Sequence, residues 1–176
     1  MNQHTVLLMG KQLWGWGRAA DLISFQIGQE RAVIDHRGQP KTVGEFALHI
    51  QCPWRITSNG KLLVGRGDLY YPSDGSVSRQ DFNWDVVGAN RCDVILDRLF
   101  DERGPLVIQK FELQSAAVLQ VVLTHAICVE VFPDASADQE HWRLFEPYTG
   151  KPHTIAKGVL VGLDSQQRKS GAGGPR

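Results

Sequence analysis

The sequence predicts a mainly antiparallel β fold, a barrel or sandwich of about 9–10 strands with one principal α-helix near residues 91–103, which is α+β by strict count. Three observations support this prediction. A long segment alternates apolar and polar residues, an Asn-Gly pair separates two β-rich runs, and helical periodicity is strong in a single segment. A parallel α/β fold is disfavoured because its crossover connections would need several helices.

Two short β-rich runs, Thr5–Met9 and Leu22–Ile27, open the chain, and each is closed by a glycine. Trp14 and Trp16 lie between these runs. Residues two apart in an extended chain project to the same face. The two rings therefore form either a buried aromatic pair or an aromatic surface.

The clearest strand pattern spans residues 44–56, where apolar side chains at positions 46, 48, 50, 52, 54 and 56 alternate with mostly polar ones. This period of two is typical of a strand with one buried face. Pro53 lies inside the pattern and cannot donate a hydrogen bond to a neighbouring strand. We therefore expect an edge strand, or a strand that is bulged or bent at Pro53.

A β-hairpin is expected directly after this strand. Asn59 and Gly60 stand between two β-rich runs, and both central residues of a type I′ turn need a positive φ, which these two residue types adopt readily.

The helix prediction depends on residues 90–105. Asn90 can cap the N-terminus, with Asp93 at the third helical position, and Gly104-Pro105 provides a stop. Asp93, Asp97 and Asp101 are spaced four residues apart and share one helix stripe, which we expect to be the solvated side.

Five short β-rich segments follow the helix and predict a meander, while the Gly- and Ser-rich residues 165–176 are expected to be a disordered tail. Residues 1–164 are then expected to form a single globular β-rich domain, since this length is typical of one domain.

The balance of charged residues limits the classes of binding partner that we expect. Nineteen basic and nineteen acidic residues cancel, so no basic field favours nucleic acid or an anionic membrane, and we expect neither. No signal peptide or long apolar run is present, and three widely spaced cysteines do not suggest a disulfide framework. These features predict a cytoplasmic protein with reduced cysteines.

The sequence contains only weak motifs for metal binding or catalysis. The pattern His-x-x-Cys occurs at His49 and again at His125, but residues three apart in a strand point to opposite faces, so we predict no metal site and no cofactor. Asp68 ends an Arg-Gly-Asp tripeptide, which we interpret as a chance match in which Asp68 caps the following turn. No hydrolase, phosphate-loop or metalloprotease motif occurs, so no catalytic residue is assigned.

The polar face of the 44–56 strand offers the main alternative. His49, Gln51 and Arg55 lie on it. If this face lines a cavity, these side chains could bind an anion or a carboxylate; otherwise it is an ordinary solvated face. Asp68 could join His49 and Arg55 across the hairpin in an enzyme site, because catalytic groups need not be close in sequence.

A resemblance to known proteins also favours a protein without catalytic residues. The stretches GRAADL, GEFALHIQCPWRI and EHWRLFEP, with PHTIAKG after them, are similar to segments of an uncharacterised family of bacterial cytoplasmic proteins. The closing WRLFEP…H pattern also resembles immunity-type proteins of bacterial toxin–antitoxin and contact-competition systems. The resemblance implies a binding role and carries no catalytic residues.

The leading hypothesis is therefore a non-enzymatic binding protein, immunity-like, that holds a protein partner or itself as a homodimer through a sheet face or edge. The first alternative is a small-ligand carrier built on a closed β-barrel whose cavity is lined by Trp14 and Trp16. The second is an enzyme with His49, Arg55 and Asp68 in its site. Candidate binding residues are Trp14, Trp16, His49, Gln51, Arg55 and Asp68.

Overall fold

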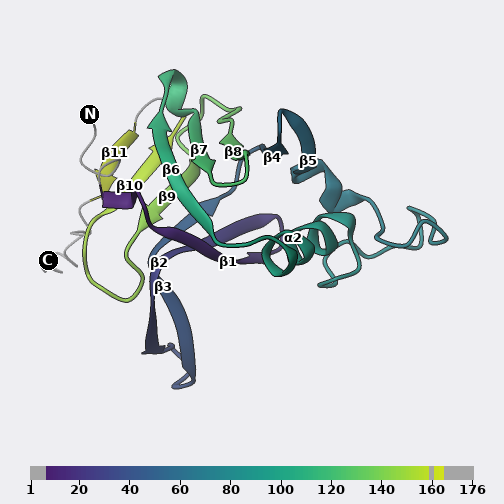
Figure 1. The fold of residues 1–176 in the computed structure, drawn as a ribbon, viewed down its shortest axis with the longest axis horizontal. Coiled ribbons are helices and arrows are strands. Elements are labelled where there is room, and N and C mark those ends of the chain that lie inside the picture. The colour runs from purple at the N-terminus through teal and green to yellow at the C-terminus, as the bar shows by residue number, and fades with distance from the viewer. Residues whose placement is uncertain (1–6, 159–160, 165–176) are drawn as a thin grey trace, which may run out of the picture.

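The computed structural model describes residues 7–158 and 161–164. Eleven strands form one antiparallel sheet in the order β11-β10-β9-β3-β2-β1-β6-β7-β8-β4-β5, and α2 (Arg91–Glu102) is the principal helix (Figure 1). The strands are β1 (Gln12–Ala19), β2 (Leu22–Ile34), β3 (Pro40–Ile50), β4 (Trp54–Ser58), β5 (Lys61–Gly65), β6 (Leu106–Leu113), β7 (Leu119–Leu123), β8 (Ile127–Val131), β9 (Glu140–Phe145), β10 (His153–Lys157) and β11 (Val161–Asp164). The predicted mainly antiparallel fold with one principal helix is confirmed.

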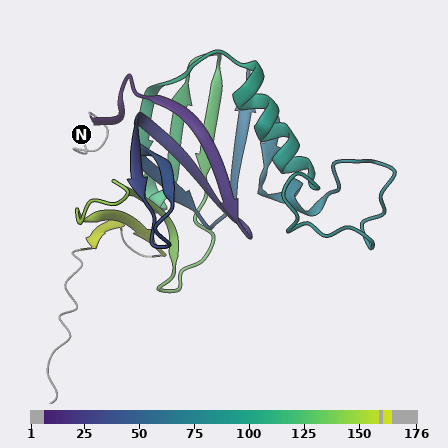
Figure 2. The ribbon, with the colours of Figure 1, turned by 90° about the horizontal axis from the view of Figure 1, so that it is seen from below.

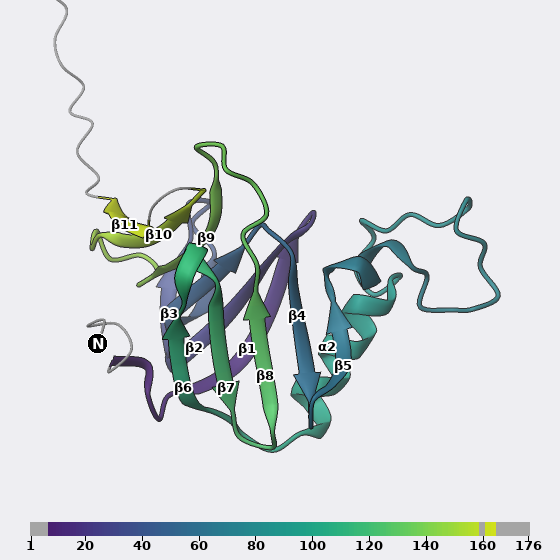
Figure 3. The same ribbon diagram turned by 90° about the horizontal axis from the view of Figure 1, so that it is seen from above.

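The sheet is strongly bent, and its two halves face each other across one apolar core. In Figures 2 and 3, β1, β2 and β3 cross over β6, β7 and β8. The buried cluster takes side chains from both halves, among them Phe25, Leu48, Trp142, Ile56, Ile108 and Val129. β5 and β11 are the two ends of the sheet and do not pair with each other, so the sheet is not closed into a barrel.

Helix α2 covers the concave side of the sheet beside β1 and β5 (Figure 2). It begins as expected, because the Asn90 side chain accepts a hydrogen bond from the backbone N–H of Asp93 at 2.8 Å. Leu96 and Leu99 are buried in the core. The ring of Phe100 stacks on that of Phe25 in β2, with centroids 6.3 Å apart.

A buried ion pair ties the first turn of α2 to β1. The Arg18 guanidinium donates to both carboxylate oxygens of Asp93 at 2.8 and 2.9 Å, and neither side chain is more than 4% exposed. Asp93 also accepts from the backbone N–H of Gly88 and from the Asn90 amide. The prediction that Asp93 lies on a solvated stripe is therefore wrong, whereas Asp97 and Asp101 are exposed as expected.

The 44–56 strand pattern is divided between two strands. β3 ends at Ile50 and β4 begins at Trp54, so the chain turns a corner around Pro53 and passes from one half of the sheet to the other. This is the bend expected at Pro53. The expected hairpin follows β4, and both of its turn residues have positive φ, 51° at Asn59 and 74° at Gly60.

The predictions for the segments after α2 and at the two ends of the chain have different outcomes. Strands form in all five segments predicted after α2, but the meander is confirmed only for β6, β7 and β8, because β9 pairs with β3 in the other half of the sheet. The strand predicted at Thr5–Met9 is wrong where it is described, because residues 7–8 are helical, and the segment between the two expected strands itself forms β1. The tail predicted for residues 165–176 lies outside the described residues.

An irregularity in the β2–β3 hairpin shapes the outer face of the sheet. The register shifts after Ile27, where a Cβ on Gly44 would lie 2.7 Å from the Ile27 backbone nitrogen. Two side chains bond the backbone here. Gln26 accepts a hydrogen bond from the Gly44 N–H at 2.8 Å, and the Trp14 indole donates to the Gly28 carbonyl at 2.9 Å. Beyond this point the hairpin continues as a two-stranded arm (Figure 1).

Candidate binding site

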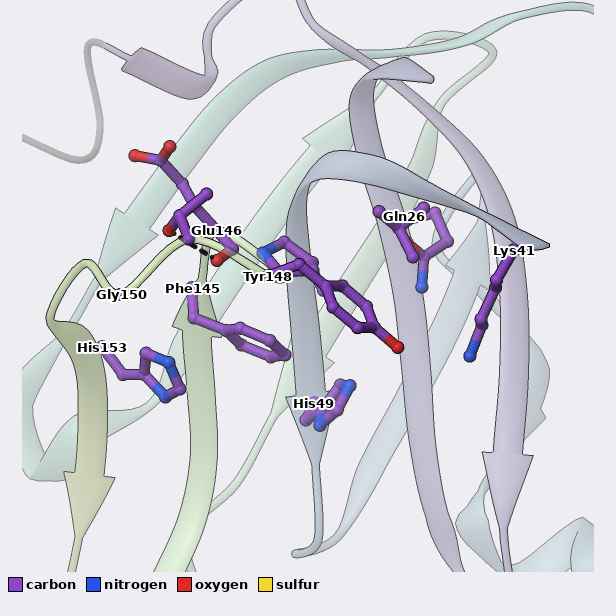
Figure 4. A pocket seen from close by; sticks show the side chains of 12 residues that line it. Gln26, Lys41, His49, Phe145, Glu146, Tyr148, Gly150 and His153 are labelled. Atoms are coloured by element: carbon purple, nitrogen blue, oxygen red, sulfur yellow. Dashed lines mark hydrogen bonds between the residues drawn. The ribbon is translucent and has the colours of Figure 1, made fainter. Parts of the chain in front are cut away.

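A pocket of about 480 Å³ lies on the outer face of β2, β3, β9 and β10, on the side of the sheet away from the core (Figure 4). Small-molecule sites commonly have volumes of about 300–1,000 Å³. The strands contribute Gln26, Lys41, Ala47, His49, Phe145 and His153, and the loop after β9 covers one side.

The pairing of β2, β3 and β9 determines which side chains form the floor of the pocket. Gln26, Ala47 and Phe145 are opposite one another on β2, β3 and β9. Cross-strand partners point to the same face of a sheet. The small Ala47 side chain between two larger ones therefore leaves the hollow. His49 occupies the next row of the same face, opposite Arg143.

Aromatic rings form the inner wall. The Phe145 ring meets the edge of His49 with centroids 4.8 Å apart, and it lies 4.6 Å from the His153 ring on the other side. The three rings come from β3, β9 and β10, so the paired strands hold them in place. They present a largely apolar surface with polar ring nitrogens at two points.

The loop that follows β9 forms the outer wall. Tyr148 is 54% exposed, and in Figure 4 its ring extends toward the space between His49 and Lys41. Its φ of 57° is unusual for a bulky residue. The loop is held at both ends, because Thr149 donates to the Glu146 carbonyl at 2.9 Å and Arg31 on the arm donates to the Pro147 carbonyl at 2.8 Å.

The pocket has excess positive charge. The Glu146 carboxylate is bonded by Lys151 at 2.7 Å, and Arg143 forms an ion pair with Glu140. Lys41 is exposed and makes no ion pair with any described residue. Burial, and next the positive charge of Arg143, lowers the pKa of His49 to about 4, so its ring is neutral at pH 7.

The predicted site residues do not all meet. His49 lines the pocket, whereas Gln51 is exposed and donates to Glu140 at 3.0 Å. Arg55 follows the corner at Pro53 and pairs with Glu130 on the outer face of the other half of the sheet. Asp68 accepts from the Gly65 N–H at 2.9 Å, as the expected turn cap. The enzyme site proposed from His49, Arg55 and Asp68 is therefore not assembled.

The two tryptophans at the start of β1 do not line the pocket on β2, β3, β9 and β10. A register shift between Leu13 and Gly15 breaks the alternation of the strand. Trp16 lies opposite Phe25, packs against the core and donates to Asp97 at 3.1 Å, while Trp14 bonds the hairpin backbone. The closed barrel expected for a ligand carrier is not formed, because the sheet is open, and these two rings have structural partners instead of a barrel cavity.

The two His-x-x-Cys patterns are separated by strand geometry. Cys52 is buried in the core while His49 faces the outer pocket, and His125 lies in a tight turn with φ 59°. Among the residues that the structure describes, no three His, Cys, Asp or Glu side chains are grouped to hold a metal ion.

Most residues of the pocket could not be predicted from the sequence. Lys41 and Gln26 stand on strands whose pairing could not be foreseen, and Tyr148 belongs to a loop. The one available signal was the segment Phe145–His153, in which aromatic residues and histidine surround a Pro-Tyr-Thr-Gly turn.

Comparison of the chain with protein-family models, with curated proteins and with solved structures finds no match in any of the three. The resemblance to immunity-type proteins therefore stays a prediction. Within the described residues, the structure has no helix with the length and hydropathy required to traverse a bilayer.

Proposed function

We propose that this protein is a non-enzymatic binding protein and that the pocket between β3 and β9 is its binding site. One observation carries the proposal: the polar face of β3, with His49 on it, lines a hollow of small-molecule size instead of open solvent. Aromatic walls with a few convergent polar groups are typical of ligand sites. The dispersal of His49, Arg55 and Asp68 favours binding over catalysis.

A fragment screen by ¹H–¹⁵N NMR tests this site. Compounds of mixed charge and shape are titrated into the wild-type protein, into Ala47→Phe, which fills the pocket floor, and into Gln120→Phe, which adds the same ring on the outer face of β7. We expect shifts centred on His49, Phe145 and Tyr148 in the wild type and in Gln120→Phe. They should be lost in Ala47→Phe.

Shifts centred on another surface, or none at the pocket with any compound, would contradict the proposal. Tyr148→Ala is a second variant for the case that Ala47→Phe does not fold, because Tyr148 is an exposed loop residue whose loss leaves the core intact.

A protein partner or a second copy remains the second candidate. The observation that favours it is Ile34, which is 63% exposed near the end of the β2–β3 arm. A large apolar side chain on a projecting element can insert into a pocket of a second chain and anchor an interface. Sedimentation velocity that finds a dimer in the wild type and a monomer in Ile34→Lys would support self-association, and a monomer in both would exclude it.

We further propose a cytoplasmic location. All three cysteines are free thiols, and unpaired cysteines suit a reducing compartment. Fractionation of the native host with an antibody to this chain tests the location.

A further inference from the structure

We propose that the pocket binds a small planar aromatic carboxylate, with the ring against Tyr148 and the carboxylate on Lys41. This inference rests on the proposed function and names the ligand class of the same site. It combines an aromatic lining with Lys41, which makes no ion pair with any described residue.

The charge comes from two cations on one face of the β2–β3 arm. Arg31 is opposite Val43, and Lys41 is opposite Val33, so both cations point to the face that carries Val43, which lines the pocket. Neither cation forms an ion pair with a described residue. Arg31 donates to backbone carbonyls, which leave its charge uncompensated.

Two of the acids around the pocket are already held in ion pairs. Glu146 bonds Lys151 and Glu140 bonds Arg143. Asp35 lies in the turn of the arm, outside the pocket lining. It accepts from the backbone N–H groups of Arg37 and Gln39 at 2.8 Å, and its negative charge offsets part of the positive charge of Lys41. Among the described side chains that line the pocket, the acid is Glu146, which Lys151 already neutralises, whereas Lys41 in the same lining is exposed and favours an anion.

The hydrogen-bonding groups also favour an acceptor ligand. Gln26 bonds the Gly44 N–H through its side-chain oxygen, so its amide nitrogen remains as a donor. The neutral His49 ring has one N–H donor and one acceptor nitrogen, the Tyr148 hydroxyl donates or accepts, and the Lys41 ammonium group donates only. Donors thus outnumber free acceptors, which is the complement of a carboxylate.

The aromatic part of the ligand follows from the shape of the site. Phe145 already packs between two histidine rings, whereas Tyr148 is exposed and extends over the opening (Figure 4). A flat ring entering the pocket would gain an offset-stacked contact with Tyr148 and cover the floor at Ala47.

Isothermal titration calorimetry with a matched charge series tests the inference. The probes are naphthalene-2-carboxylate, its neutral carboxamide, the cationic naphthalen-2-ylmethylammonium, and cyclohexanecarboxylate, which has the charge without the aromatic ring. We expect naphthalene-2-carboxylate to bind about tenfold or more tightly than each of the others. Lys41→Gln should remove the preference over the carboxamide, and Lys61→Gln, which changes an exposed lysine on β5, should preserve it.

The outcomes separate the two proposals. Equal or tighter binding of the neutral or cationic probe at the pocket would overturn the ligand class while the binding site stands. A preference that survives in Lys41→Gln would overturn the role of Lys41. Binding of none of the four probes would overturn the ligand class, and the binding site itself would fail only if the mixed fragment screen also finds nothing there.

Discussion

Arg18 and Asp93 form a buried ion pair in which two guanidinium nitrogens, Nε and one Nη, bond the two carboxylate oxygens. The pair joins β1 to the first turn of α2. The remaining Arg18 donors bond Asp85 and backbone carbonyls of the loop before the helix. One arginine therefore fixes three separate segments of the chain.

Asp93→Ala should lower the free energy of unfolding by about 3–5 kcal/mol, because it leaves the Arg18 charge buried without its partner. Asp101→Ala is the control, since Asp101 is exposed on the same helix stripe; its effect should stay below about 0.5 kcal/mol. Urea unfolding measures both. Equal losses in the two variants would show that the ion pair has no special role.

Gly44→Ala should destabilise the protein by about 1–3 kcal/mol and weaken binding at the pocket, because the new Cβ would contact rigid backbone atoms of Ile27 and Phe46. Gly67→Ala should be nearly neutral, since open space surrounds Gly67. Thermal unfolding compares the two variants. A neutral Gly44→Ala would mean that the hairpin irregularity is not fixed by this close approach.

His49 should make stability fall in mild acid. Its pKa in the folded protein is lowered to about 4, below the ordinary value of 6.5. The unfolded chain therefore binds a proton that the folded chain excludes, and stability is lost as the pH falls from about 6.5 toward 4.

His49→Gln should lose less stability than the wild type between pH 7 and pH 5, by on the order of 1 kcal/mol once partial exposure is allowed for. Urea unfolding at both pH values measures this difference, and an NMR titration measures the His49 pKa directly. A folded-state value at or above 6.5 would refute the prediction.

Tyr148→Asn should weaken ligand binding without loss of stability. The φ of 57° at Tyr148 costs roughly 1–2 kcal/mol for a bulky residue, while asparagine tolerates this conformation better. We expect the free energy of unfolding to change by less than about 1 kcal/mol, and affinity for naphthalene-2-carboxylate to fall about tenfold. A large loss of stability would indicate that the Tyr148 ring serves the fold.

Local patterns predicted much of the fold. The alternation from Phe46 to Ile56 identified six buried side chains, five on β3 and β4 and Cys52 in the corner between them. Asn59-Gly60 and Asn90 correctly predicted a hairpin and a helix start. β1 was missed because its glycines and register shift interrupt the alternation. Its identity as a strand depends on its neighbours, β2 and β6.

The site was harder to predict because it depends on pairing between distant segments. His49 was identified on the correct face, but its pocket exists because β3 pairs with β9, about 90 residues later in the chain, as a register contact between His49 and Arg143 shows. Arg55 was wrongly grouped with His49 because alternation does not reveal that the chain changes sheet halves at Pro53. Asp93 was misplaced because helix periodicity ignores the loop that covers it.

A crystal structure of the protein grown with saturating naphthalene-2-carboxylate tests the pocket most directly. We predict the naphthalene ring against Tyr148, above Ala47, with the carboxylate within hydrogen-bonding distance of the Lys41 Nζ. Density for the compound on another surface, with the pocket between β3 and β9 left to solvent, would contradict the assignment of this pocket as the binding site.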